Sequence, residues 1–305
     1  MKTVIISGAA GFVGYHLIKN FQRKGVFVIA LCRPGSFHNK RLKEFTNLKM
    51  IECDTSHFLF LETELQRFNP DVFFHLAWEG TTGEKRGDYA VQLSNVKETC
   101  DAYTLAALIG CKKFIATGTV YECLAEQVLS AEQFNLLSYY VLAKRYAYEA
   151  LLQLSKKLKL DLTWCMFCQP IGRYIKLNQL MAYLIYELKE GRRPYLGMAE
   201  NPFDIIVVED LVEGLYLAGI CKLKNKKYYI GSERPRQLKE YLKKAGEIIA
   251  PEIELIFGER ADDGLHFSYD WLDSTAFRTE TGFSNCFSFE DGIKNVAVWV
   301  DECRK

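Results

Sequence analysis

The sequence predicts an α/β fold in which a doubly wound parallel sheet is joined to a smaller, segmented C-terminal lobe. Short runs rich in β-branched residues alternate with helical patterns through the first half of the 305-residue chain. Neighbouring parallel strands need crossover connections, which the helical segments supply. The expected strands are apolar almost throughout, as strands buried on both faces of a sheet are.

Six strands and four helices can be placed in order in this half. Each strand is short and rich in Val, Ile, Leu or Phe, whereas the helices show longer patterns of apolar and polar positions. The expected strands cover residues 3–7, 26–32, 48–53, 71–77, 113–118 and 160–168. The expected helices cover residues 13–23, 39–45, 89–108 and 139–158.

A glycine motif follows the first expected strand. In "SGAAGFVG", Gly8, Gly11 and Gly14 lie between that strand and the first helix. The first glycine permits a tight turn, the second lets a diphosphate approach the backbone, and the third lets the helix pack on the sheet. The N–H groups at the start of the helix then bind the phosphates. The motif predicts a dinucleotide site, with a plain tight turn as the alternative.

The ends of the next two strands bear on the choice of cofactor. An NAD site usually carries Asp or Glu after the second strand, but here Cys32 is followed by Arg33. An arginine can pair with a ribose 2′-phosphate, so NADP(H) is favoured and NAD(H) stays possible; a solvated side chain is the alternative. Asp54, after the third strand, could bind the adenine amino group or cap a helix.

The second half of the chain is less regular. Loop-forming stretches become frequent after Cys168, yet two β-like runs remain at 203–208 and 226–231. We therefore expect an NAD(P)-binding domain over residues 1–168, with returning segments near 205–232. A substrate-binding lobe is expected from residues 169–204 and 233–305.

Composition and charge favour a soluble globular protein with a small-molecule partner. A net charge of +1 gives no bulk attraction to nucleic acid or to an anionic membrane. Glycines interrupt the N-terminal apolar run before it reaches the length of a signal peptide or membrane span, so we expect a cytoplasmic protein. The ten cysteines are expected to be reduced. Cys165 and Cys168 lack a second pair, so no metal is expected.

A Tyr-x-x-x-Lys pair lies in the helical stretch "SYYVLAKRYAYEALL". Tyr140 and Lys144 are four residues apart, so their side chains leave the same face of the helix. A free tyrosine has a pKa of about 10, and a neighbouring ammonium lowers it toward the range needed for proton exchange. Tyr139, Tyr146 and Tyr148 have no lysine at this spacing and are expected to pack in the core, an interface or a pocket wall.

Segments along nearly the whole chain resemble the extended short-chain dehydrogenase/reductases, in particular the nucleotide-sugar epimerase/dehydratase group. In order they are "GAAGFVG", "FHLAW", "LSNVKET", "ATGTVYE", "SYYVLAK", "CQPIG", "FDIIVVEDL", "YYIGS", "ERADDGL", "WLDSTAF" and "SFEDGIKNVAVWV". The resemblance implies a Rossmann-type fold, an NAD(P)-dependent enzyme and a nucleotide-sugar substrate.

The resemblance also implies roles for individual residues. Tyr140 and Lys144 match the family's acid/base and its supporting lysine, and Thr117 matches its hydroxyl residue, although a buried strand threonine is the alternative. His75 is expected to be a core or backbone-bonding residue, and Asn95 could have a surface or capping role. The expected substrate residues are Thr119, Gln169 and Arg260. The expected cofactor residues are Gly8, Gly11, Phe12, Val13, Gly14, Arg33, Asp54, Leu76, Ala77, Trp78, Asn95, Tyr140 and Lys144.

At two positions the sequence departs from the family pattern, which affects the expected reaction and the expected nucleotide contacts. The 4,6-dehydratases carry an acidic pair after the catalytic threonine, but this chain has Gly118 and Thr119, so dehydration is not expected. Phe203 replaces the arginine that usually precedes the aspartate matching Asp204, so one nucleotide contact is missing. The basic pair at 192–193 could compensate or could lie on the surface.

Three functions stay open. Reduction of a 4-keto-6-deoxy-hexose nucleotide is favoured, because Arg33 and "HLAWEG" resemble ketoreductases. A 4-epimerase with retained NAD is the alternative, because "TGTVY" and "QPIG" look more like that subgroup. A non-catalytic NADPH sensor or scaffold is less favoured, since Tyr140 and Lys144 are both present. The resemblance further implies a homodimer in which the helices at 89–108 and 139–158 form a four-helix bundle with a partner.

Overall fold

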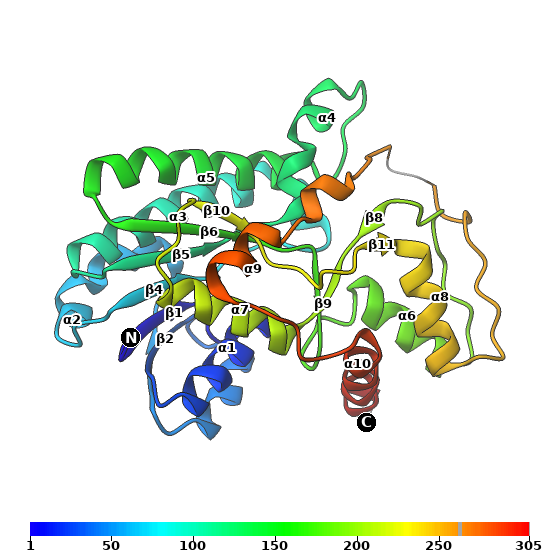
Figure 1. The fold of residues 1–305 in the computed structure, drawn as a ribbon, viewed down its shortest axis with the longest axis horizontal. Helices are drawn as coiled ribbons and strands as arrows, with labels where there is room; N and C mark the ends of the chain where they lie inside the picture. The colour runs from blue at the N-terminus through cyan, green and yellow to red at the C-terminus, as the bar shows by residue number, and fades with distance from the viewer. Residues whose placement is uncertain (262–263, 305) are drawn as a thin grey trace.

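The computed structural model describes residues 1–261 and 264–304 (Figure 1). Within these residues, a seven-stranded parallel sheet has the order β10-β6-β5-β4-β1-β2-β3. The order reverses between β1 and β4, which places the ligand crevice of such a sheet at the carboxyl ends of the strands there. The strands are β1 (Thr3–Ser7), β2 (Phe27–Cys32), β3 (Leu48–Glu52), β4 (Val72–His75), β5 (Lys113–Thr117), β6 (Asp161–Met166) and β10 (Lys227–Tyr229).

Helices cover both faces of the sheet, which confirms the predicted doubly wound fold. The helices α3 (Tyr89–Leu108) and α5 (Ser138–Leu158) lie on one face, and α1 (Phe12–Arg23) and α7 (Val208–Ile220) on the other (Figure 1). Successive strand residues point to opposite faces. Ile5 therefore packs in the core beneath α3 and α5, whereas Val4 and Ile6 pack beneath α1 and α7. All three side chains are fully buried, which explains why the strands are apolar throughout.

Shorter helices connect the strands. The helix expected at 39–45 is a 3₁₀ helix, η1 (Phe37–Glu44), in which six of the eight residues are polar or charged and few side chains are buried. The other connecting helices are η2 (Thr55–Leu61), α2 (Glu62–Gln66), η3 (Glu84–Gly87), η4 (Val120–Leu124) and α4 (Ala125–Ser130).

The remaining elements form a group beside the sheet. Two small sheets pair β7 (Gln169–Ile171) with β9 (Ile205–Val207) and β8 (Pro202–Phe203) with β11 (Arg236–Gln237). The run expected at 203–208 is thus divided between these sheets and the start of α7, and it does not join the main sheet. The helices α6 (Leu180–Lys189), α8 (Leu238–Ile249) and α10 (Phe289–Arg304) pack together there (Figure 1).

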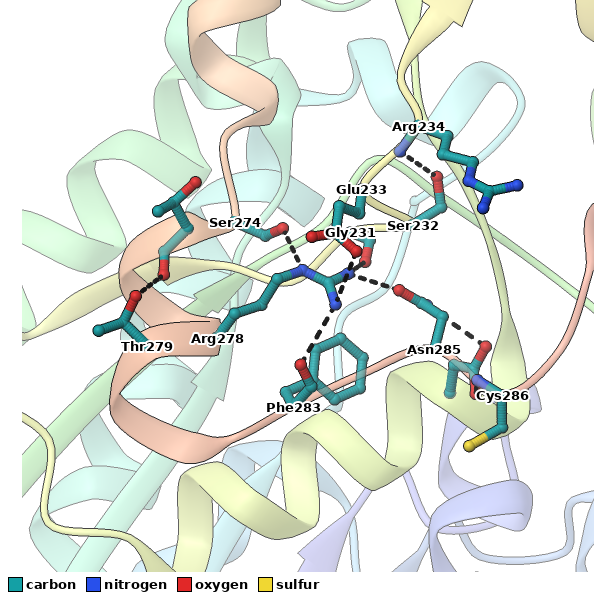
Figure 2. A network of polar contacts seen from close by, with 12 residues as sticks. Gly231, Ser232, Glu233, Arg234, Ser274, Arg278, Thr279, Phe283, Asn285 and Cys286 are labelled. Carbon is teal, nitrogen blue, oxygen red and sulfur yellow. Dashed lines mark hydrogen bonds and ion pairs between the residues drawn. The ribbon is translucent and has the colours of Figure 1, made fainter.

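Arg278 fixes the segment between these two parts of the molecule. It lies on α9 (Thr275–Thr281), which follows the 3₁₀ helix η5 (Tyr269–Leu272). Its Nε donates to Ser274 Oγ at 2.9 Å, and its Nη2 donates to the Gly231 carbonyl at 2.8 Å (Figure 2). Because Gly231 follows β10, Arg278 fastens α9 to the edge of the main sheet. In the described chain, no helix combines the length and hydrophobicity needed to cross a membrane.

Candidate functional site

A cavity of about 1360 Å³ lies at the carboxyl ends of the strands. This volume exceeds the roughly 300–1,000 Å³ of a pocket for one small ligand, so the cavity has room for two. Residues that follow β1 to β6 line one part of it, and residues 195–203 line another. The lining includes Gly8, Gly11, Phe12, Val13, Gly14, Arg33, Asp54, Leu76, Ala77, Trp78, Asn95, Thr117, Thr119, Tyr140, Lys144, Gln169 and Arg260, which are all the residues predicted to bind or react.

Gly8 and Gly14, at the two ends of the glycine motif after β1, have no room for a side chain. Gly8 has a φ of +68°, and a Cβ there would lie 2.8 Å from the Ala77 nitrogen. A Cβ on Gly14 would lie 2.3 Å from the Gly8 carbonyl oxygen. Helix α1 begins after Gly11, which provides no side-chain cap, and its first turn carries no acidic residue. The open N–H groups and the positive end of the helix dipole therefore fit a diphosphate.

Two charged residues that follow β2 and β3 also line the cavity. The Arg33 side chain is 67% exposed, and its Nη2 lies 3.6 Å from Glu79 Oε2. Asp54 caps η2 by accepting from the Ser56 backbone nitrogen at 3.0 Å and from its hydroxyl at 2.7 Å. These hydrogen bonds lower the pKa of Asp54. Asp54 therefore has the capping role that the sequence left open, while it also lines the cavity.

Two amide side chains of α3 hold the loop that follows β4. Asn95 is buried; it donates to the Glu79 carbonyl at 2.9 Å and accepts from the Glu79 nitrogen at 2.8 Å. Gln92 accepts from Trp78 Nε1 at 2.9 Å and donates to the Lys85 carbonyl at 2.8 Å. Sequence reasoning missed Gln92. Its signal was a polar side chain one turn before Asn95, on the same face of the helix.

Helix α5 brings Tyr140 and Lys144 to the end of β5, beside Thr117. Lys144 Nζ donates to the Thr117 carbonyl at 2.9 Å and lies 3.7 Å from the centroid of the Trp78 ring. The rings of Trp78 and Tyr140 meet edge to face, with their centroids 6.4 Å apart. The structure thus brings together the three residues predicted to be catalytic. The ring of Trp78 lines the cavity here and contacts both Lys144 and Tyr140.

Burial moves the proton affinities of Lys144 and Tyr140 in opposite directions. It lowers the pKa of Lys144 to about 7, although the charge of Glu122 opposes this effect. It raises the pKa of Tyr140, and the charge of Arg86 and a hydrogen bond with Thr119 oppose that change. Desolvation disfavours the charged form of both groups. Tyr140 is therefore neutral at physiological pH and holds a proton that it can donate.

The buried Glu122 carboxylate supports the turn between β5 and α4, and it too was missed by sequence reasoning. It accepts from the Thr119 nitrogen at 3.2 Å and from Trp164 Nε1 at 3.0 Å, and it pairs with Lys227 Nζ. A Cβ on Gly118 would lie 2.1 Å from Trp164 Nε1. Position 118 consequently has no room for the acidic side chain of the dehydratases. A carboxylate inside the apolar stretch "VYECL" was its only sequence signal.

The lobe side of the cavity carries an aromatic wall. The Phe203 and Phe267 ring centroids lie 6.0 Å apart, and the Phe267 and Tyr121 centroids 5.1 Å apart. At this end of the cavity the backbone nitrogen of Arg260 donates to the Leu196 carbonyl at 3.0 Å. The ring of Phe203 therefore lines the cavity at the position where the family resemblance implies an arginine.

Three other residues considered in the sequence do not line the cavity: Asp204, Arg192 and Arg193. The Asp204 carboxylate is buried and accepts from Tyr229 Oη at 2.8 Å and from the Ser232 nitrogen at 2.9 Å. Arg192 pairs with Glu187 at 2.7 Å and Arg193 with Glu259 at 2.8 Å, so both form surface ion pairs.

His75 and the cysteine pair are buried core residues. Burial lowers the pKa of His75 to about 3, and its two ring nitrogens contact the hydroxyls of Ser7 at 2.9 Å and Thr99 at 3.1 Å. Cys165 and Cys168 are buried free thiols. In the described part of the chain, no group of three or more His, Cys, Asp or Glu side chains could hold a metal ion.

Solved structures match the fold over nearly the whole chain. A UDP-glucose 4-epimerase from Thermotoga maritima superposes with a TM-score of 0.80 at 20% identity, covering 99% of this chain and 100% of the other. A UDP-N-acetylglucosamine 4-epimerase from Methanobrevibacter ruminantium superposes with a TM-score of 0.81 at 17% identity, covering 99% of both chains. At such identities these likenesses show the fold alone.

Sequence comparisons show the family. A CDP-abequose synthase from Salmonella muenchen is 25% identical over 321 residues, which cover 97% of both chains. An ADP-L-glycero-D-manno-heptose-6-epimerase from Cupriavidus pinatubonensis is 31% identical over 100 residues, 30% of this chain and 27% of that protein. The model of the NAD-dependent epimerase/dehydratase family matches residues 4–231. The resemblance inferred from the motifs is thus confirmed: the chain is an enzyme that belongs to the NAD-dependent epimerase/dehydratase family.

Proposed function

We propose that the protein is an NADP(H)-dependent reductase of a nucleotide-linked 4-keto-6-deoxy-hexose. The observation that carries the proposal is the meeting of Thr117, Tyr140 and Lys144 with the glycine loop in one cavity. When bound, the nicotinamide cofactor supplies a hydride to the substrate carbonyl carbon. Tyr140 gives its proton to the carbonyl oxygen, which the hydroxyl of Thr117 holds in place.

The cofactor site in this proposal uses residues of the first three strands. The glycine loop and the start of α1 hold the diphosphate, and Lys144 holds the ribose next to the nicotinamide. Arg33 supports the choice of NADP(H), because its exposed guanidinium follows β2, where an NAD site usually carries an acid. Glu79, at 3.6 Å, holds the guanidinium at this edge until a 2′-phosphate replaces it.

The substrate site in this proposal lies against the lobe formed by residues 169–204 and 233–305. Arg260 pairs with the diphosphate of the sugar nucleotide, Gln169 hydrogen-bonds to it, and Thr119 contacts the sugar. A cytidine carrier is the first to test, because the relative that aligns over 97% of the chain is a CDP-abequose synthase.

A 4-epimerase is the second candidate. The segments "TGTVY" and "QPIG" favour it, and an epimerase would use the same three catalytic residues with a retained cofactor. The crowding at Gly118 argues against a dehydratase. The ten free cysteines support the cytoplasmic location predicted from the sequence.

A panel of nucleotide sugars and their 4-keto derivatives separates these candidates. NADPH oxidation is followed for each compound, and the products are analysed for a change of configuration at C4. A reductase consumes NADPH with a 4-keto substrate, whereas an epimerase changes the configuration without net consumption. Binding of NADPH with neither reaction would identify a sensor or scaffold and overturn the proposal.

A further inference from the structure

Arg86 lies at the catalytic corner, the part of the cavity formed by Thr117, Tyr140 and Lys144, although no sequence motif marks it. Its guanidinium carbon is 5.0 Å from the ring centroid of Tyr140 and 5.1 Å from that of Tyr121. The side chain lines the cavity, and its Nε is buried without a hydrogen-bond partner. Among the described residues, no carboxylate lies within ion-pair distance of Arg86. The guanidinium instead lies against the rings of Tyr121 and Tyr140, which attract a cation through their π faces.

The loop that carries Arg86 is held on both sides. Gln92 of α3 donates to the Lys85 carbonyl at 2.8 Å, directly before Arg86. Directly after it, a Cβ on Gly87 would lie 2.6 Å from Leu136 Cδ1, in the segment that leads into α5. The short helix η3 is thus wedged between α3 and the start of α5, which fixes the guanidinium over the tyrosine rings.

The second cation of the site is directed elsewhere. Lys144 Nζ donates to the Thr117 carbonyl and lies over the Trp78 ring. The guanidinium of Arg86, by contrast, lies over the Tyr140 ring, and its charge lowers the pKa of Tyr140. Arg86 is thus a cation that acts on the proposed proton donor.

We propose that Arg86 stabilises the phenolate that Tyr140 becomes after it gives its proton to the sugar oxygen. The inference rests on the proposed function, in which Tyr140 is the proton donor. The proton passes from the Tyr140 hydroxyl to the substrate oxygen, while the hydride passes from the reduced nicotinamide cofactor to the substrate carbon. The ketone is reduced, the cofactor is oxidised, and the phenolate later takes a proton from water.

Within the described residues, two charged groups act on Tyr140: Arg86 of η3 and Glu122 of η4. The ring of Tyr121, also on η4, lies 6.5 Å from that of Tyr140, and Lys144 on α5 is directed to the Thr117 carbonyl. The negative Glu122 disfavours the phenolate, although its pairing with Lys227 weakens this effect. Removal of Arg86 leaves Glu122 as an opposing charge, so the phenolate becomes harder to form.

Site-specific incorporation of 3,5-difluorotyrosine at position 140 gives a direct test. Fluorination lowers the pKa of the phenol into the range where the protein stays folded, and ¹⁹F NMR then follows that one residue in unliganded protein. We expect Arg86→Met to raise this pKa by about one unit or more and Arg86→Lys to restore part of the shift. Arg145→Met removes an exposed cation that pairs with Glu149 on α5 and should leave the pKa unchanged.

Turnover gives a second measurement. We expect Arg86→Met to lower the single-turnover rate about tenfold, with partial rescue in Arg86→Lys. An unchanged pKa of residue 140 in Arg86→Met would overturn the inference, whatever happens to the rate, because a role in holding the loop does not require that shift. The titration needs no substrate. It therefore still decides the role of Arg86 if the panel of nucleotide sugars finds no reaction.

Discussion

Burial determines how readily Lys144 holds a proton. Folding leaves this side chain 4% exposed and lowers its pKa to about 7. The hydrogen bond to the Thr117 carbonyl and the contact with the Trp78 ring do not replace the lost hydration of the ammonium. The charged lysine therefore destabilises the fold, as expected of a residue kept for function rather than for packing.

The stability of Lys144→Met should accordingly depend on pH in a defined direction. Between about pH 7 and pH 10, the unfolded chain holds a proton on Lys144 that the folded protein has released, so wild-type stability rises with pH in this window. Below about pH 7 the lysine is charged in both states and its full penalty applies. We expect Lys144→Met to unfold at a higher urea concentration than the wild type at about pH 6.5, with a smaller difference at about pH 9. Equal differences at both pH values would contradict this account.

Arg33 is the residue on which the proposed preference for NADP(H) depends. Its exposed guanidinium can pair with a 2′-phosphate that NADH lacks. Arg33→Ala should therefore weaken NADPH binding about 10- to 100-fold, from the loss of about 1.5–3 kcal/mol of charged hydrogen bonds, and leave NADH binding unchanged. Calorimetry measures both affinities, and Lys40→Ala, an exposed lysine on the same segment, is the control. An equal loss for both cofactors would argue against NADP(H) selection by Arg33.

At the scale of an element, the turn from β5 into η4 depends on a buried charge. Glu122 is fully buried and holds the Thr119 nitrogen, the Trp164 indole and Lys227. The side chain of Thr119 also acts to lower the pKa of Tyr140. The Glu122 carboxylate therefore positions Thr119, which lines the cavity, although Glu122 does not line the cavity itself.

Replacement of this carboxylate should loosen the turn. Glu122→Gln leaves Lys227 without its buried partner, so we expect it to lower the unfolding free energy by about 1–3 kcal/mol. Glu126→Gln, at an exposed position on α4, should change it by less than about 0.5 kcal/mol. Urea denaturation measures both. The double change Glu122→Gln with Lys227→Met should recover part of the loss, and full additivity would show that the two residues are not coupled.

At the scale of the whole molecule, local patterns predicted most of the fold and the cavity. The strands, the long helices, the glycine loop and the Tyr140–Lys144 pair are all set by spacing within one or two elements. Gln92, Glu122 and Arg86 were missed because their roles depend on partners that the fold brings close. Glu122, for example, meets Trp164 from β6 and Lys227 from β10. The run at 203–208 was read as one sheet element because its apolar pattern does not show where the chain changes sheets.

Apolar side chains on the outer surfaces of α3 and α5 support the homodimer inferred from the family resemblance. Leu93 on α3 and Tyr146 on α5 are both 60% exposed, and the two helices pack against each other. We expect a dimer by light scattering, which Leu93→Glu with Tyr146→Glu should convert to monomers because charges would be buried at the interface. Leu129→Glu, on α4, is the control and should stay dimeric. A monomeric wild type at every concentration would refute the proposed dimer.

In the proposed function, Tyr140 donates the proton in a reaction at a sugar carbonyl. Tyr140→Phe keeps the ring that packs against Trp78 and removes only the hydroxyl. In single-turnover assays with NADPH and the 4-keto nucleotide sugar that the panel identifies, we expect the rate to fall about 10²- to 10⁴-fold while NADPH affinity stays near the wild-type value. An unchanged turnover rate would contradict the account.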